Sequence, residues 1–172
     1  KGELDKYTEI LRAHGRPHPV FELAIKWLAD NVPPSQARCL VHGDFRMGNL
    51  MVAPEKGVVA ILDWELAHIG DPMEDLGWPC VPSWRFGQHE NPVGGFGQRE
   101  DFYAAYEAAG GTIDRAAVRF WEILGTLKWG IMCTMMATAF TSGADRTVER
   151  AAIGRRASET EIDLLRMLEG QD

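Results

Sequence analysis

The sequence predicts an α+β fold that is mainly helical and has a small β-hairpin element at its centre. Apolar residues recur at helical spacing before Pro33 and again after Gln98, which predicts amphipathic helices in both regions. Short β-rich runs occupy the stretch between Cys39 and Leu62. The polar motifs that could carry chemistry lie at the ends of these runs, so the functional site is expected at the β element.

Two helices are expected ahead of the β element. A polar helix over residues 1–13 should end at the turn Gly15-Arg16-Pro17, and an amphipathic helix over Val20–Ala29 should end before Pro33-Pro34. Three short strands should follow, the last two joined as a hairpin: Cys39–Val41, Leu50–Val52 and Val58–Leu62.

Helices dominate again after the strands. Ile69–Pro72 is expected to form a turn, with Asp71 as the cap of a helix from Pro72 through Leu76. Residues 79–97 are rich in proline and glycine, which predicts a long irregular loop. Three further helices should complete the fold: Gln98–Ala109, a buried one from a cap at Thr112 or Asp114 to about Thr141, and Thr147–Leu168.

The composition predicts a folded protein without a nucleic-acid or membrane partner. Its 172 residues suffice for a single domain over 1–172, and the net charge of −7 comes with no basic stripe for nucleic acid. The uncharged run Trp129–Phe140 is too short to cross a bilayer. Three scattered cysteines form no CxxC pair, so neither a disulfide framework nor a zinc site is expected, and a reducing cytoplasm fits best. The oligomeric state stays open.

Three oxygen-bearing side chains stand at the ends of the β segments. Asn49 follows Asp44 by five residues, and Asp63 comes fourteen residues later, directly after the apolar run Val58–Leu62. A carboxylate that orients a hydroxyl group, together with two oxygen ligands that hold Mg²⁺ against phosphates, is what phosphoryl transfer needs. The spacing therefore predicts that the three side chains meet at one kinase-like site.

The segment HGDFRMGN, followed by ILDWE, resembles the catalytic and metal-binding loops of the aminoglycoside phosphotransferase and choline kinase-like family, which has a protein-kinase-like fold. The segment Gly70–Leu76 (GDPMEDL) is similar to the GDPxxDL segment of that family. Within the family, the sequence is most similar to a bacterial branch whose relatives also occur beside acyl-CoA dehydrogenases. The resemblance implies that the chain is the C-terminal lobe of this fold, with ATP as phosphoryl donor, Mg²⁺ as cofactor and a hydroxyl group of a small molecule as acceptor.

The resemblance also assigns roles to single residues. Asp44 would be the catalytic base, and Asn49 and Asp63 would bind Mg²⁺ and, through it, the nucleotide. Arg46 would neutralise charge on the transferred phosphoryl group, although a surface arginine that pairs with Glu65 or Glu74 is an equal alternative.

Other residues near the motifs are expected to have supporting roles. His42 should bond backbone carbonyl groups, and Asp75 should accept backbone N–H groups of the catalytic loop. The tryptophans Trp64, Trp78 and Trp84 could form an aromatic cage for a quaternary ammonium group, but loop anchoring and core packing are the preferred interpretation.

The sequence before Val41 contains no glycine-rich strand-turn-strand that could cover nucleotide phosphates. We therefore expect an N-terminal nucleotide-binding lobe to be absent from this chain, and we expect residues 1–172 alone to bind Mg-ATP poorly. Two alternatives stay open: a non-catalytic kinase-like binding module, and a metal-dependent hydrolase built on His42, Asp44 and Asp63 with His68 as a further ligand. The sequence does not specify the acceptor.

Overall fold

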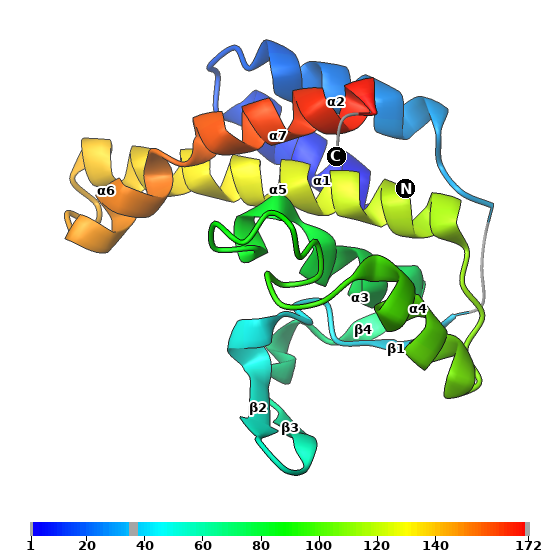
Figure 1. The fold of residues 1–172 in the computed structure, drawn as a ribbon. Coiled ribbons are helices and arrows are strands. Elements are labelled where there is room, and N and C mark those ends of the chain that lie inside the picture. Colours follow the sequence, from blue (N-terminus) through cyan, green and yellow to red (C-terminus); the bar gives the residue numbers. More distant parts are fainter. Residues whose placement is uncertain (1, 35–37, 171–172) are drawn as a thin grey trace. The chain divides into compact units, whose positions relative to one another are not determined.

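The computed structural model describes residues 2–34 and 38–170 of the chain (Figure 1). These residues form two compact units. The first, here called the helical unit, comprises Lys1–Val32 and Ile123–Asp172, and the second, here called the mixed unit, comprises Pro33–Glu122. Helix α5 (Arg115–Ser142) contributes to both units, because their boundary follows Glu122.

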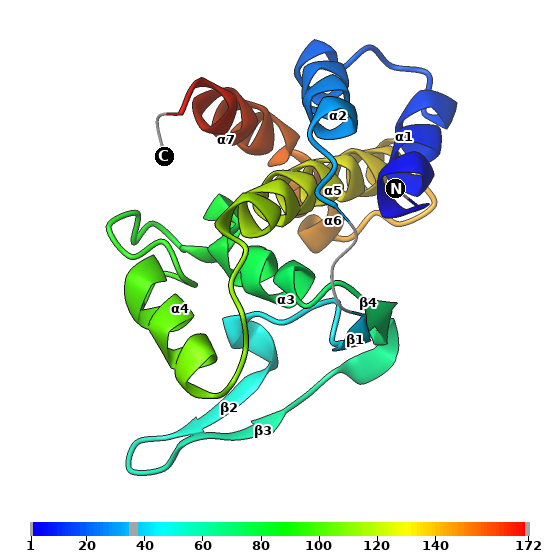
Figure 2. The same cartoon turned by 90° about the vertical axis from the view of Figure 1, so that its right-hand side faces the viewer.

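The helical unit contains α1 (Gly2–Ala13), α2 (Pro19–Asp30), most of α5, α6 (Val148–Gly154) and α7 (Ala157–Glu169). Figures 1 and 2 show α1, α2 and α7 around the α5 segment, and α2 packs against α7. The core consists of fully buried apolar side chains from these helices, including Phe21, Leu28, Leu127, Ile131 and Leu164. The two helices predicted before Pro33 are thus confirmed to within one or two residues.

The single helix predicted over Thr147–Leu168 is wrong, since α6 and α7 are separate helices. Thr147 caps α6 as a predicted start should, because its hydroxyl accepts a hydrogen bond from the Arg150 backbone. The break follows from packing: a Cβ atom on Gly154 would lie 2.7 Å from the Ala137 backbone. The chain turns where α6 reaches this close contact with α5, and helical periodicity alone carries no sign of it.

The mixed unit holds two small antiparallel sheets. Strand β1 (Cys39–Val41) pairs with β4 (His68–Gly70), and β2 (Leu50–Ala53) pairs with β3 (Gly57–Ile61) as the predicted hairpin, which projects as a narrow ribbon in Figure 2. Strand β4 lies where a turn was expected. Its three residues have little strand character of their own, and they become a strand because they pair with β1.

The remaining elements of the mixed unit are helical or irregular. They are α3 (Met73–Gly77), two 3₁₀ helices over Trp78–Cys80 and Pro82–Trp84, α4 (Arg99–Ala108) and the first part of α5. The stretch 79–97 is otherwise irregular, as predicted. Asp114 caps α5, because its carboxylate accepts hydrogen bonds from the backbone N–H groups of Ala116 and Ala117.

The core of the mixed unit joins α3, α4 and α5 through buried side chains that include Met73, Leu76, Tyr103 and Val118. A Cβ atom on Gly77 would lie 2.8 Å from the Glu122 backbone nitrogen, so α3 runs directly against the α5 backbone. Helix α5 is long and apolar enough to span a membrane by length and composition, but half of that apolar window is buried, as in the core helix of a globular protein.

Candidate active site

The candidate site lies at the junction of the two small sheets, within the mixed unit. Residues 42–49, here called the catalytic loop, connect β1 to β2, and Asp63 follows β3. Leu62 joins them: its N–H donates to the Asn49 carbonyl oxygen at 2.8 Å, and its carbonyl oxygen lies 2.8 Å from His42 Nε2. Asp63 therefore directly follows Leu62, the residue that is hydrogen-bonded to both ends of the catalytic loop.

Both carboxylate oxygens of Asp44 accept hydrogen bonds. Oδ1 accepts from the indole Nε1 of Trp78 at 2.7 Å and from Arg46 Nε at 3.2 Å. Oδ2 accepts from the Asn49 amide nitrogen at 2.8 Å. The carboxylate is thus held at a fixed orientation by three donors from two segments of the chain.

Asn49 is buried, and its amide orientation follows from its neighbours. Its Nδ2 donates both to the Asp44 backbone oxygen at 2.9 Å and to Asp44 Oδ2. Both partners are acceptors, so the amide nitrogen must face them and Oδ1 must point away. The Asn49 Oδ1 atom is therefore the one that could serve as a metal ligand.

Asp63 is exposed and has a left-handed backbone conformation, with φ 64° and ψ 59°. Within residues 2–34 and 38–170, its carboxylate makes no hydrogen bond or ion pair that would occupy its oxygens. Asn49 Oδ1 and this carboxylate are hard oxygen donors, the kind that Mg²⁺ prefers, and Mg²⁺ takes its other ligands from water and phosphates. By the chemistry of their donor atoms, the two residues suit Mg²⁺.

The hydrolase alternative finds no support in this arrangement. Among the residues that the structure describes, no group of three or more His, Cys, Asp or Glu side chains could hold a metal ion. The ring nitrogens of His68 lie 2.9 Å from the Leu66 carbonyl oxygen and 3.2 Å from a Glu74 carboxylate oxygen. His68 therefore has partners outside the catalytic loop.

The expected supporting contacts of His42 and Asp75 are present. The Asp75 carboxylate accepts the backbone N–H groups of His42 at 2.6 Å and of Gly43 at 2.9 Å. The His42 ring accepts the Asp44 N–H at Nδ1, 3.1 Å away, so Nε2 carries the proton that is donated to Leu62. These bonds fix the backbone of the loop on both sides of Gly43.

Gly43 has a structural reason to be glycine. Its φ of +80° lies in the left-handed region, and a Cβ atom there would lie 2.7 Å from the Leu66 carbonyl oxygen. Asp71, in the GDPMEDL segment, also has a structural role: it accepts the Met73 backbone N–H at 2.9 Å and the Trp121 indole N–H at 3.2 Å. Asp71 thus starts α3 and ties it to α5.

Arg46 pairs with Asp44 rather than with Glu65 or Glu74, and its guanidinium carbon lies 5.1 Å from the Trp84 ring centroid. The Trp84 and Trp78 rings are 5.4 Å apart, centroid to centroid. The third tryptophan, Trp64, instead packs against His42, with ring centroids 4.8 Å apart and an interplanar angle of 55°. The three rings anchor different parts of the loop, which agrees with the preferred interpretation over an aromatic cage.

Sequence reasoning missed the contact between Trp78 and Asp44. The two residues are 34 positions apart, and the only local signal is that Trp78 directly follows the GDPMEDLG segment.

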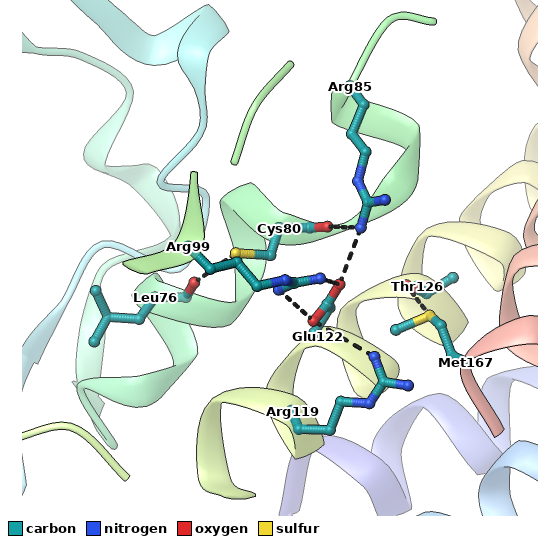
Figure 3. A network of polar contacts seen from close by, with 8 residues as sticks. All are labelled: Leu76, Cys80, Arg85, Arg99, Arg119, Glu122, Thr126 and Met167. Atoms are coloured by element: carbon teal, nitrogen blue, oxygen red, sulfur yellow. Dashed lines mark hydrogen bonds and ion pairs between the residues drawn. The ribbon is translucent and has the colours of Figure 1, made fainter. Parts of the chain in front are cut away.

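It also missed a buried network around Glu122, which Figure 3 shows from close by. Arg99 donates to both Glu122 carboxylate oxygens, at 2.9 and 2.8 Å, and Arg85 donates to Glu122 at 3.3 Å and to the Cys80 carbonyl oxygen at 3.0 Å. Arg119 lies 3.8 Å from the same carboxylate. The network ties the irregular 79–97 stretch and the start of α4 to α5.

The fold and the arrangement of the loops resemble those of kinase-like phosphotransferases. Residues 3–121 match the model of the "Phosphotransferase enzyme family". The chain belongs to this family.

A solved structure and several curated proteins are similar to this chain. The crystal structure of a candidate aminoglycoside phosphotransferase from Ralstonia eutropha JMP134 superimposes on this chain with a TM-score of 0.80 and 23% sequence identity. The match covers 98% of this chain and 54% of the chain in that crystal structure. This likeness concerns the fold, and it confirms the predicted kinase-like architecture.

The curated relatives are larger proteins. Acyl-CoA dehydrogenase family member 10 of Mus musculus is 48% identical over 64 residues, which is 37% of this chain and 6% of that protein. Family member 11 of Rattus norvegicus is 35% identical over 117 residues, 62% of this chain and 15% of that protein. "Probable acyl-CoA dehydrogenase IBR3" of Arabidopsis thaliana is 39% identical over 92 residues, 47% of this chain and 11% of that protein. The matched regions are thus small parts of these proteins.

Proposed function

We propose that this chain supplies the catalytic and metal-binding loops of an ATP-dependent phosphotransferase that moves the γ-phosphoryl group to a hydroxyl group of a small molecule. The observation that carries the proposal is the contact between Asp44 and Asn49, together with the hydrogen bond that ties Leu62, the chain neighbour of Asp63, to Asn49. A fixed carboxylate next to two hard oxygen donors suits a reaction whose catalysis depends mainly on positioning and charge neutralisation.

In this proposal, Asp44 orients the acceptor hydroxyl group and takes its proton. Such a role needs a carboxylate that cannot rotate, and the hydrogen bonds to Trp78, Arg46 and Asn49 meet that need. Asp44 is also only part-buried, which leaves it reachable for a substrate.

Asn49 Oδ1 and the Asp63 carboxylate would hold Mg²⁺. The ion, when bound, supplies positive charge against the phosphates of the nucleotide. Asn49 would contribute a ligand whose position is fixed by its buried amide group, and Asp63 would contribute the one negative charge.

Arg46 would offer positive charge to the transferred group. Its Nε is bonded to Asp44, while its side chain stays 30% exposed. A guanidinium group has further N–H donors in the same plane, so it can hold Asp44 and meet a phosphoryl oxygen with the same group.

We further propose that the remaining nucleotide contacts come from polypeptide beyond this chain. The sequence has no glycine-rich strand-turn-strand before Val41, and the superimposed crystal structure is nearly twice as long. The β2–β3 hairpin also exposes large apolar side chains, since Met51, Val52, Val58 and Val59 are each at least 50% exposed. Exposed apolar surface of this kind is typical of a face that another segment covers.

The test uses the full-length protein that contains this chain. Mg²⁺-dependent ADP release is measured with a panel of hydroxyl acceptors: aminoglycosides, amino alcohols, sugars, hydroxy amino acids and hydroxyacyl compounds. We expect acceptor-dependent ADP release that Asp44→Asn lowers by about 10²- to 10⁴-fold. Asp63→Asn should raise the Mg²⁺ concentration needed for half-maximal rate.

Asp30→Asn is the matched control, because Asp30 pairs with Lys26 on the surface of the helical unit. Parent-like activity of Asp44→Asn would overturn the assignment of the base. Mg-ATP binding without turnover on any acceptor would favour the alternative of a non-catalytic binding module.

A further inference from the structure

We propose that Trp78 is a positioning residue for Asp44, and that it makes Oδ2 the carboxylate oxygen that receives the acceptor hydroxyl group. The inference rests on the proposed function, and it assigns a role to a residue outside the three motifs. It follows from the count of donors at the two Asp44 oxygens.

The hydrogen bond from Trp78 to Asp44 is short and sheltered from water. The indole N–H reaches Oδ1 at 2.7 Å, and the Trp78 side chain is 7% exposed. A bond from a neutral donor to a charged acceptor is stronger than one between neutral groups, and it gains further where water is excluded. Trp78 therefore limits the rotation of the Asp44 side chain.

The position of Trp78 is itself fixed by packing. Trp78 directly follows α3, and Gly77 lies against the α5 backbone with no room for a Cβ atom. On its other side, the ring packs at 5.4 Å against Trp84. The next residue, Arg85, is held by Glu122 in the network of Figure 3. The indole is thus fixed by the packing of the mixed unit, whereas the side chain of Arg46, the second donor to Oδ1, is 30% exposed.

The donor count separates the two oxygens. A carboxylate oxygen has two lone pairs, and Oδ1 already accepts from Trp78 and Arg46. Oδ2 accepts only from Asn49 among the described residues, so it has one lone pair left for a substrate. It is also the oxygen next to Asn49, where the metal would be bound.

The acceptor hydroxyl group donates its hydrogen bond to Asp44 Oδ2. The hydroxyl oxygen forms a bond to the γ-phosphorus, the bond from that phosphorus to the β–γ bridging oxygen breaks, and its electron pair leaves with ADP. The hydroxyl proton passes to Oδ2. Trp78 keeps its N–H bond to Oδ1 throughout and so keeps Oδ2 directed at the acceptor.

The experiment compares Trp78→Phe with Trp121→Phe in the full-length protein, on the acceptor that the panel identifies. Both changes remove an indole N–H that donates to a carboxylate, but Trp121 donates to Asp71, outside the catalytic loop. We expect Trp78→Phe to lower kcat by about 10- to 100-fold relative to Trp121→Phe. The KM values for ATP and for the acceptor should change less than about threefold, because a misdirected base weakens the transition state more than ground-state binding.

A second variant separates positioning from packing. Incorporation of 3-benzothienylalanine at position 78 replaces the indole N–H by sulfur and keeps the shape of the ring. It should reproduce the loss in kcat with an unchanged melting temperature. A kcat equal to that of Trp121→Phe in this variant would overturn the inference, even where Asp44→Asn remains inactive. Parent-like activity of Asp44→Asn would instead refute the proposed function.

Discussion

Replacement of Glu122 by leucine should show how much the buried ionic network stabilises the mixed unit. The Glu122 side chain is 1% exposed and accepts hydrogen bonds from Arg99 and Arg85. Leucine has a similar volume, so the change removes the acceptor oxygens without opening a large cavity. Arg85, only 8% exposed, would then keep the Cys80 carbonyl oxygen as its remaining acceptor from Figure 3.

The contacts of Glu122 set the expected loss of stability. Removal of one partner from a buried ion pair costs about 3–5 kcal/mol, because an uncompensated charge stays buried. The Arg99 side chain is 24% exposed, so water can recover part of its solvation. We therefore expect Glu122→Leu to lower the free energy of unfolding by about 2–4 kcal/mol, out of a total of about 5–15 kcal/mol for a typical domain.

The sign of the pH dependence follows from the pKa of Glu122. Removal of the carboxyl group from water raises its pKa above the ordinary value, and the guanidinium groups of Arg99, Arg119 and Arg85 offset only part of that rise. As pH rises, the unfolded chain therefore loses this proton before the folded chain does, and the stability contributed by Glu122 falls. The difference between the parent and Glu122→Leu should be larger at pH 5 than at pH 8.

The assay is urea unfolding followed by tryptophan fluorescence at both pH values. Glu100→Leu is the matched control, because Glu100 makes an exposed bidentate pair with Arg115, at 2.6 and 2.5 Å. The Glu100 side chain is 72% exposed and the Arg115 side chain 62%. Solvent screens such a pair, so the control should stay close to the parent. Equal losses for the two variants would refute the argument that burial makes the Glu122 network important.

Two further predictions concern the loop backbone and the thiols. Gly43→Ala should lower the free energy of unfolding by at least about 2 kcal/mol and abolish activity, because left-handed strain adds to the clash with the Leu66 carbonyl oxygen. The control Gly57→Ala, with φ +71° and open space around it, should cost only about 1 kcal/mol. Equal losses of stability for the two variants in thermal melts would contradict this reasoning. At pH 8, iodoacetamide should label exposed Cys39 alone, because burial raises the pKa of Cys80 to about 12 and of Cys133 to about 11. Mass spectrometry that finds Cys80 labelled in the folded protein would argue against its burial.

Features set by local sequence could be predicted, and features set by tertiary contacts could not. The β2–β3 hairpin and the Asp114 cap follow from nearby residues, and the spacing from Asp44 to Asn49 placed these two side chains in contact. Strand β4 exists because it pairs with β1, and α6 ends where Gly154 meets Ala137. Neither contact has a signal in the local pattern.

The same distinction holds at the site. The role of Asp75 could be expected from its place in the GDPMEDL segment that resembles the family, although its bonds to His42 and Gly43 span 33 and 32 residues. The bond from Trp78 to Asp44 and the arginines around Glu122 join residues from separate elements. Such pairs depend on how α3, α4 and α5 pack, which a single sequence does not reveal.

The left-handed conformation of Asp63 implies a trade-off between thermal stability and metal binding. A non-glycine residue with φ 64° costs about 1–2 kcal/mol relative to relaxed backbone, and glycine would remove most of that cost. Directed evolution that rewards heat resistance alone should therefore recover Asp63→Gly, with a higher melting temperature and without the carboxylate. Variants selected in this way would gain thermal stability and lose the carboxylate that could hold a divalent ion. Any selection for stability in this protein therefore needs turnover as a second criterion.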